Sequence, residues 1–318
     1  MLTNVCNERC SFCYADDFFK AKPVSNERDL GVLLEALTHY AGLVAKAPPL
    51  PPYDASVDEL SATYYASRVV NLMGGEPSLH PDFERVVDHI HSLDLGLILF
   101  TNGSTPDKVE AIRDKLWSIT MNGLFAARAP TLPFPRERIF VNLPHRRGDD
   151  VVRRLQTVYD AGIRAVFLAF ATPAGGARSK YYTPNDVAEM REVHGRALAF
   201  CEAHGIHLGY DCSFPLCVDQ RVMQTKCTSV PVMDSQGFMS ICGGEYFSRK
   251  EPRHVTAFDS LEELHTWTFG LIEKMRAFPS QFDVCNGCEH FNVECHGMCL
   301  VFRDQSGADR GGVADAAK

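Results

Sequence analysis

The sequence lacks long apolar runs, a targeting segment and any excess of basic charge. No hydrophobic stretch in its 318 residues is long enough to cross a bilayer, and the first residues, MLTNVCNERC, lack the basic and apolar regions of a signal peptide. With a formal net charge of −8, the composition predicts no nucleic-acid-binding surface. We therefore expect a cytoplasmic protein with neither membrane nor nucleic-acid partners.

Cysteine, by contrast, is abundant, with 12 residues in the chain. A disulfide framework needs an oxidising compartment, and the missing signal peptide argues against one. Closely spaced cysteines in a reducing compartment are typical of metal or cluster ligands. Cys201 is the expected exception, because it falls inside a helical pattern and reads as a buried thiol.

Short apolar runs alternate with amphipathic stretches as far as about residue 213. The apolar runs predict six strands, buried on both faces, at 2–5, 68–73, 95–101, 138–143, 165–171 and 207–211. The amphipathic stretches predict helices at 29–45, 82–93, 108–116, 150–161 and 185–204. This alternation predicts an α/β fold with a parallel sheet and right-handed crossovers.

Other segments interrupt or follow this alternation. A proline-rich insertion at 47–65 precedes the second predicted strand, and 118–137 is a long connection ahead of the fourth. Loops of this length are more often functional or lid-like than structureless. Beyond residue 211 the periodicity is lost and eight cysteines follow. We expect a core domain over 1–211, a small cysteine-rich domain over 212–303 with a helix near 260–278, and a disordered tail over 304–318.

Cys6, Cys10 and Cys13 form a CxxxCxxC motif directly after the first predicted strand. Thiolates favour zinc and iron–sulfur clusters. A structural zinc site usually has four protein ligands, whereas three cysteines can hold three irons of a [4Fe–4S] cluster and leave the fourth iron for a small molecule. Half of a zinc site is the alternative. The position favours a cluster, because chemistry in β/α arrays lies at the C-terminal ends of the strands.

A second motif, MGGEPS, ends the second predicted strand. Gly74 and Gly75 allow the backbone to approach a ligand closely. Glu76, which precedes Pro77, places a carboxylate where it can pair with an amine. A GGEP sequence alone is compatible with an ordinary turn. After a cysteine loop at the previous strand end, it favours a binding site.

Together these motifs resemble those of the radical S-adenosylmethionine (radical SAM) enzymes, over about residues 2–213. The matching residues are Cys6, Cys10 and Cys13, the aromatic Phe12, the turn Gly74, Gly75, Glu76 and Pro77, and the TNGS segment with Thr101 and Asn102. The resemblance implies a partial (β/α)6 TIM-like barrel. It also implies a [4Fe–4S] cluster whose fourth iron binds SAM.

The resemblance further implies an activity. One-electron reduction of the cluster, by a donor such as flavodoxin or ferredoxin, cleaves SAM to a 5′-deoxyadenosyl radical that abstracts a substrate hydrogen. The GGEP turn would contact the amino group of SAM, and Phe12 would pack near the adenine. Asn142 and Arg147, at and after the fourth predicted strand, are candidates for the SAM ribose or carboxylate, although ordinary loop polar residues are equally expected there.

The C-terminal cysteines form a second constellation. Their CxxC and CxxxC spacings argue against scattered core thiols, and zinc knuckles remain an alternative. Given the barrel upstream, the region resembles the SPASM or shorter twitch auxiliary-cluster domain. The matching residues are Cys227, Gly237 and Cys242, then Cys285, Cys288, Cys295 and Cys299 with one extra residue before Cys295.

The family's ligation implies a first auxiliary [4Fe–4S] cluster held by an upstream ligand together with Cys227, Cys242 and Cys299. Cys217 is preferred to Cys212 as the upstream ligand. A second cluster would use Cys285, Cys288 and Cys295. No cysteine follows Cys299 in this sequence, so the second cluster lacks its last thiolate: another residue completes it, one iron stays open, or the cluster is absent. One or two auxiliary clusters are therefore expected.

Many enzymes with this combination modify ribosomally synthesised peptides, by cross-linking, epimerisation or oxidation. We therefore expect a radical SAM oxidoreductase or maturase acting on a peptide. Oxidation or rearrangement of a small-molecule natural-product intermediate is the alternative, and a non-catalytic zinc or cluster scaffold is a third. Because the chain begins at the first predicted strand, we expect recognition of a peptide by a separate protein or by direct docking.

Candidate acid or base residues are few. Tyr210 and Asp211 fall at the end of the sixth predicted strand, where we expect them to face the barrel cavity and exchange a proton or hydrogen atom. Cys212 is a candidate hydrogen-atom donor as an alternative to a cluster ligand. Polar residues at strand ends also commonly bind only water.

Overall fold

The computed structural model describes residues 2–3, 5–8, 10, 13, 27–50, 68–171, 180–210, 214–222, 231–241, 253–277, 280 and 282–299. Several expectations concern residues outside these ranges. They are those for Phe12, Asp211, Cys212, Cys227, Cys242, most of the 47–65 insertion and the tail 304–318.

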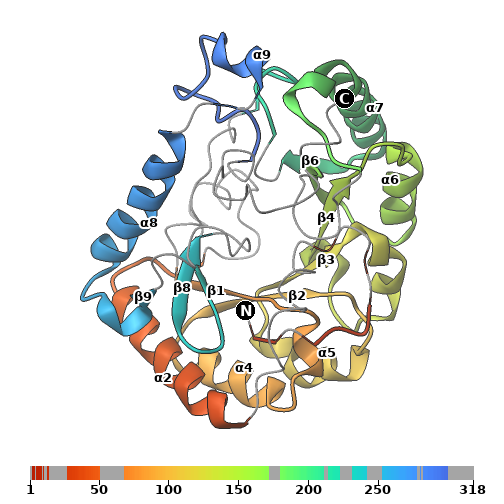
Figure 1. The fold of residues 1–318 in the computed structure, drawn as a ribbon. Helices are drawn as coiled ribbons and strands as arrows, with labels where there is room; N and C mark the ends of the chain where they lie inside the picture. The colour runs from red at the N-terminus through yellow and green to blue at the C-terminus, as the bar shows by residue number, and fades with distance from the viewer. Residues whose placement is uncertain are drawn as a thin grey trace.

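The described residues include a six-stranded parallel sheet in the order β1-β2-β3-β4-β5-β6. The strands are β1 (Val69–Leu72), β2 (Gly96–Thr101), β3 (Ser118–Asn122), β4 (Ile139–His145), β5 (Ala165–Phe170) and β6 (His207–Tyr210). Consecutive parallel neighbours need a crossover between them. The crossovers run through helices along the outer side of the curved sheet (Figure 1). The predicted partial (β/α)6 barrel is confirmed.

The crossover helices lie where the amphipathic patterns predict them. They are α4 (Phe83–Ser92), α5 (Pro106–Ile112), α6 (Val151–Asp160) and α7 (Val187–His204). The remaining predicted helix, α2 (Glu27–Leu43), precedes β1. On α4 the buried residues are Phe83, Val86, Val87 and Ile90, a spacing that places one apolar stripe against the sheet. Asp150 begins α6, since its side chain accepts from the amides of the first turn. Gly205 ends α7 in the left-handed conformation, at φ 61°.

One strand of the sheet differs from the prediction. The segment 118–137, expected to be a connection, begins with β3, which lies between β2 and β4. Its sequence, SITMN, alternates apolar and polar residues, and only Ile119 and Met121 are apolar and fully buried. It therefore lacks the continuous apolar run by which the other strands were predicted. The rest of the segment forms the 3-10 helices η4 (Gly123–Thr131) and η5 (Arg136–Arg138).

The predicted first strand, 2–5, is not assigned as a strand among its described residues. Its backbone nevertheless continues the hydrogen bonding past the end of β1. Leu2 N–H donates to the Met73 carbonyl at 2.7 Å, and Thr3 O accepts from Gly75 N at 2.8 Å. The chain entering the cysteine motif therefore lies against the end of β1.

Side chains along the strands alternate between two faces. On β4 the odd-numbered residues from Ile139 to His145 are fully buried, while Phe140, Asn142 and Pro144 are half-buried. The fully buried set lies under the crossover helices, and the half-buried set faces the barrel interior. Strand register places Asn122 and Phe167 beside Asn142 on this interior face.

The C-terminal part rests on α2. Three antiparallel strands, β7 (Pro231–Met233), β8 (Phe238–Ile241) and β9 (Arg253–His254), are followed by α8 (Leu261–Arg276), which confirms the predicted helix, and by α9 (Asp283–Asn286). Met239, Phe258 and Leu264 pack with Ala36 of α2 in one apolar cluster. Across the described ranges, no helix has both the length and the apolar character needed to cross a bilayer.

Candidate functional site

The first three cysteines lie on the segment that continues from the end of β1. Cys6, Cys10 and Cys13 are all half-buried and carry no disulfide. Cys13 N donates to the Cys10 carbonyl at 3.1 Å, and Glu8 N donates to Cys6 Sγ at 3.4 Å. Burial raises the pKa of the Cys6 thiol, and burial together with the neighbouring Cys6 raises the pKa of the Cys10 thiol. A metal that binds these thiols must displace their protons.

Two glycines allow the end of β1 to approach this segment. A Cβ on Gly74 would lie 2.4 Å from the Thr3 carbonyl oxygen, and one on Gly75 would lie 2.1 Å from that of Val5. No real Cβ fits at such distances. The glycines thus fix the contact between the GGEP turn and the backbone that leads into Cys6. The close approach predicted for a ligand is made here to the chain itself.

Glu76 is fully buried and its carboxylate is engaged by protein donors. Its Oε1 accepts from the hydroxyls of Ser78, at 2.6 Å, and Thr101, at 2.9 Å. Its Oε2 accepts from the backbone N–H of Asn102 at 2.6 Å. The carboxylate therefore ties the GGEP turn to the end of β2, instead of standing open to pair with an amine as the sequence suggests.

The cysteine loop is held by two further side chains. Asn102, at the end of β2, donates from Nδ2 to the side-chain oxygen of Asn7 at 2.8 Å. Arg128, from η4, donates to Glu8 Oε1 at 2.7 Å and to the Asn102 carbonyl at 3.2 Å. Its guanidinium also lies over the Phe125 ring, 4.7 Å from the centroid. The contacts to Asn7 and Glu8 fall on residues between Cys6 and Cys10.

Sequence reasoning did not find Arg128, Asn7 or Glu8. Asn7 and Glu8 lie inside the cysteine motif, at positions where the spacing constrains only the cysteines. Arg128 lies 120 residues from Glu8, in a segment expected to be a loop. The only available signal was the opposite charge of the two residues, which many other pairs in the chain share.

Two predicted cofactor-binding residues have different surroundings. Asn142 lies on the interior face of β4, beside Asn122, so it remains a candidate for contact with a bound molecule. Arg147 forms ion pairs with Asp186 and Glu189, both at 3.4 Å. Its charge is therefore committed to the residues that begin α7.

The expectation that Tyr210 faces the barrel cavity is wrong. Tyr210 pairs in register with Leu168, a fully buried residue of the helix-covered face. Its hydroxyl contacts His194 Nε2 of α7 at 2.7 Å. Burial raises the pKa of Tyr210 to about 12, with the nearby Asp219 carboxylate adding to the effect. Tyr210 therefore belongs to the packing between the sheet and α7.

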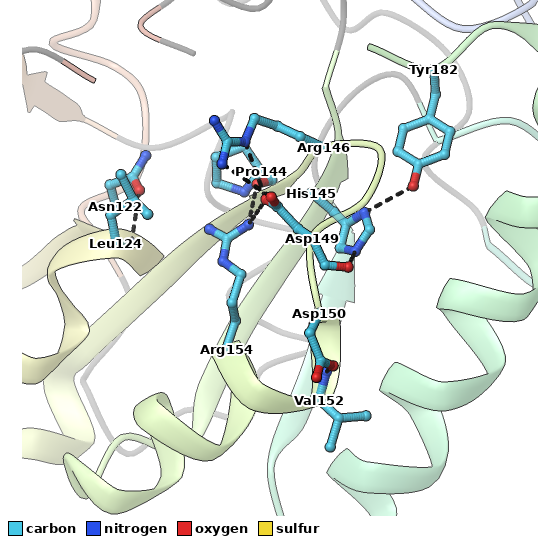
Figure 2. A network of polar contacts seen from close by, with 10 residues as sticks. All are labelled: Asn122, Leu124, Pro144, His145, Arg146, Asp149, Asp150, Val152, Arg154 and Tyr182. Carbon is cyan, nitrogen blue, oxygen red and sulfur yellow. Dashed lines mark hydrogen bonds and ion pairs between the residues drawn. The ribbon is translucent and has the colours of Figure 1, made fainter. Parts of the chain in front are cut away.

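A polar network holds the loop that follows β4 (Figure 2). His145 is buried between the Tyr182 hydroxyl, 3.1 Å from Nδ1, and the Asp149 carbonyl, 3.2 Å from Nε2. Arg146 and Arg154 converge on the Asp149 carboxylate, with contacts at 3.0 and 3.2 Å, and Arg154 also donates to the backbone. Burial, with Arg154 nearby, lowers the pKa of His145 to about 4. The network fixes the end of the strand that carries Asn142.

The C-terminal cysteines are described in part. Cys285 and Cys295 are buried, Cys299 is half-buried and Cys288 is exposed. Burial raises the pKa of the Cys217 thiol to about 11, with Cys295 and Cys285 adding to the effect. Within the described ranges, no three His, Cys, Asp or Glu side chains are grouped as ligands of one metal ion. The cysteines of a [4Fe–4S] cluster each bind a different iron, so they stand further apart than the ligands of a single ion.

The similarity of the chain to known proteins agrees with the cysteine motif. A family model described as the Radical SAM superfamily matches residues 1–173, more than half of the chain. The chain belongs to the radical SAM superfamily. None of the curated protein sequences compared with it matches.

Two solved structures show the fold of this radical SAM chain. Streptococcus suis SuiB bound to S-adenosylmethionine is 14% identical, with a TM-score of 0.59; the alignment covers 93% of this chain and 71% of SuiB. SuiB bound to its precursor peptide SuiA is 13% identical, also with a TM-score of 0.59, and the alignment covers 94% of this chain and 70% of SuiB.

Membership of the radical SAM superfamily implies SAM and a [4Fe–4S] cluster, and the residues present fit them. The donor set is three half-buried thiols on one loop, which suits iron–sulfur ligation. That loop is fixed to the ends of β1 and β2 by the Gly75 and Asn102 contacts. Parallel strands of a barrel present their C-terminal ends on one side, where ligands bind.

Proposed function

We propose that this radical SAM enzyme reductively cleaves SAM and abstracts a hydrogen atom from a peptide substrate. The observation that carries the proposal is the fixed attachment of the cysteine loop to the GGEP turn and to Asn102. When bound, the cluster supplies one electron that splits SAM into methionine and a 5′-deoxyadenosyl radical. An external donor such as a flavodoxin or ferredoxin would provide that electron.

The chain's own residues divide into ligands and supports. Cys6, Cys10 and Cys13 would each bind one iron, leaving the fourth iron for the amino and carboxylate groups of SAM. The backbone of the GGEP turn would lie beside the SAM amino group. Glu76 supports this arrangement indirectly, because its buried carboxylate holds the turn against the Asn102 backbone.

Further contacts to SAM are proposed on the same side of the barrel. Thr101 and Asn102 end β2 next to the cysteine loop, and Asn142 faces the interior from β4. Phe12, which lies outside the described residues, would pack near the adenine. Together these side chains would orient the SAM ribose and exclude water from the cleaved bond.

A peptide is the substrate class that the comparisons favour. SuiB has been solved with the precursor peptide SuiA bound, and it shares this fold. We therefore propose that the present chain modifies a ribosomally synthesised peptide, by cross-linking, epimerisation or oxidation, and that it docks the peptide directly or through a separate recognition protein.

The C-terminal cysteines would bind auxiliary [4Fe–4S] clusters in a small domain over 212–303. Such clusters would accept or relay the electron left when the substrate radical is oxidised. Cys285 and Cys295 are buried on one short segment and form no disulfide, which supports this role. Zinc bound there in place of iron could not accept or relay an electron. Metal analysis of the purified protein therefore distinguishes auxiliary clusters from zinc sites.

The test is anaerobic reconstitution with iron and sulfide, followed by incubation with SAM and dithionite. We expect about eight to twelve irons per chain, at roughly four per cluster, and formation of 5′-deoxyadenosine detected by mass spectrometry. Addition of a candidate precursor peptide should give a mass change in the peptide. A small metabolite consumed in place of any peptide would refute the substrate assignment.

A further inference from the structure

Glu8 lies inside the cysteine motif, two residues from Cys6 and two from Cys10. Its backbone N–H donates to Cys6 Sγ at 3.4 Å. Its side chain contacts a segment distant in sequence, where Oε1 accepts from Arg128 Nη2 at 2.7 Å. One residue of the loop therefore contacts both a proposed iron ligand and an arginine of η4.

Charges of both signs lie beside the described part of the cysteine loop. Glu76 is fully buried, and its backbone N–H donates to the carbonyl of Val5, one residue before the first cysteine, at 2.8 Å. Glu8 adds a second carboxylate from within the loop. Arg128 brings a positive charge to the same place, because its guanidinium contacts Glu8 and the Asn102 carbonyl.

Arg128 is held beside the loop by more than its ion pair. Partly exposed pairs such as this one usually contribute little, because their side chains move and water screens them. Here the guanidinium also donates to the Asn102 carbonyl at 3.2 Å and lies over the Phe125 ring, 4.7 Å from the centroid. Its charge therefore has a fixed position beside the loop.

A charge fixed at this place affects the reduction of a bound cluster. Reduction adds negative charge, so the reduction potential depends on nearby charges, on hydrogen bonds to sulfur and on exposure to water. A carboxylate nearby opposes the added charge and lowers the potential, whereas a guanidinium favours it and raises the potential. The loop thiols agree with these signs: burial raises the pKa of Cys10, Glu8 adds to the rise and Arg128 opposes it.

We propose that Arg128 and Glu8 are opposed charges that set the reduction potential of the cluster on the cysteine loop, Arg128 raising it and Glu8 lowering it. This inference rests on the proposed function, since it assumes a cluster bound by the N-terminal cysteines. It gives the ion pair an electrostatic role besides holding the loop. Without Arg128, the charges of Glu8 and Glu76 would make it harder for an external donor to reduce that cluster.

A purely structural role for the pair predicts different signs. If Arg128 only holds Glu8 so that its N–H reaches Cys6 Sγ, loss of either partner weakens the same hydrogen bond to sulfur. Both losses would then lower the potential, since such a hydrogen bond favours the reduced cluster. With opposed charges, loss of Arg128 lowers the potential and loss of Glu8 raises it.

The experiment is a redox titration of the full chain after anaerobic reconstitution, followed by electron paramagnetic resonance. The signal to follow is the one whose g-values change when SAM is added to a parallel sample, which assigns it to the N-terminal loop. Arg128→Gln should shift the midpoint potential to more negative values, and Glu8→Gln to more positive values. Each shift should correspond to roughly a tenfold change in the equilibrium constant for reduction, or about 59 mV for one electron.

Combined and conservative variants sharpen the result. Arg128→Gln with Glu8→Gln removes one charge of each sign, so its midpoint should lie between those of the single variants. Arg128→Lys keeps the charge and should stay close to the wild type. The control variants are Arg113→Gln and Glu110→Gln, which remove an exposed ion pair near the start of β3 and should leave the midpoint unchanged.

Other outcomes would overturn the inference. Shifts of the same sign in Arg128→Gln and Glu8→Gln would leave the pair with a structural role only, and unshifted midpoints in both would show that neither charge acts on the cluster. If Glu8→Gln fails to assemble, equal midpoints in Arg128→Lys and Arg128→Gln at equal iron content would contradict the electrostatic role. A reconstituted wild type without any SAM-responsive signal would refute the proposed function, and this inference with it.

Discussion

Arg128 contacts Glu8 through an ion pair of 2.7 Å that joins the β3–β4 connection to the cysteine loop. The same guanidinium donates to the carbonyl of Asn102, whose side chain holds Asn7. Arg128, which is distant in sequence, thus contacts the loop directly at Glu8 and indirectly through Asn102. The loop that would bind the cluster is therefore positioned from β2 and η4 as well as from β1.

Removing this brace should slow SAM cleavage. Both side chains are partly exposed, at 39% for Arg128 and 25% for Glu8, so the effect on global stability should be small. Because ligand geometry matters more than stability here, Arg128→Ala should lower the rate of 5′-deoxyadenosine formation by about tenfold, a barrier change of roughly 1.4 kcal/mol. Arg128→Lys should restore part of it.

The matched control is Arg113→Ala, which removes an exposed arginine that forms ion pairs with its neighbours Glu110 and Asp114. It should leave the rate unchanged. A normal rate in Arg128→Ala, measured at equal iron content, would refute the positioning role.

Gly75→Ala should prevent assembly of the N-terminal site. The added Cβ would lie 2.1 Å from the Val5 carbonyl oxygen, and backbone atoms there cannot give way as a flexible side chain can. We expect loss of about four irons per chain on reconstitution and no SAM cleavage. Gly195→Ala is the control, because a Cβ at Gly195 in α7 meets nothing within 4 Å. A Gly75→Ala protein with full iron content would contradict the close approach.

Glu76→Gln should destabilise the protein and weaken SAM binding. A glutamine amide presents two N–H donors to surroundings in which Ser78, Thr101 and Asn102 already donate. Unsatisfied buried donors cost about 1–3 kcal/mol, so the melting temperature should fall by several degrees. Unchanged melting together with weaker SAM binding would show that the carboxylate serves SAM directly and not the turn.

Folding stability should depend on pH through His145. Its pKa is about 4 in the folded protein and about 6.5 when exposed. The unfolded state therefore binds a proton that the folded state excludes. The stability contribution is complete above pH 6.5 and is lost as the pH falls toward 4, by up to roughly 3 kcal/mol.

Thermal melting of the wild type and of His145→Gln, at about pH 7.5 and about pH 5, checks this expectation. The wild type should lose more stability than the variant between the two conditions. Equal losses would show that His145 titrates normally in the folded state.

Much of the barrel follows from pattern alone. Five of its strands have continuous apolar runs, and the helices between them have clear starting and ending residues, so both were predicted close to their observed bounds. β3 was missed because its polar residues face the interior and leave only Ile119 and Met121 as apolar signal. β3 forms through its pairing with β2 and β4, and this pairing leaves no pattern in the local sequence.

The site residues, too, include some that the sequence predicts and some that it does not. The cysteine and GGEP motifs identify the residues that meet at the ends of β1 and β2, because the spacing itself encodes them. The roles of Glu76 and Arg128 depend on contacts between segments far apart in the chain. Tyr210 was misplaced because neighbouring strand residues point to opposite faces, so its orientation depends on register alone.

The central claim is that the N-terminal cysteine loop cleaves SAM. The most direct measurement is 5′-deoxyadenosine formed from SAM and dithionite by reconstituted wild-type protein and by the variant with Cys6, Cys10 and Cys13 changed to alanine. We expect product from the wild type and none from the variant, which should still bind iron through its C-terminal cysteines. Product from the variant, or none from a wild-type protein with full iron content, would contradict the account.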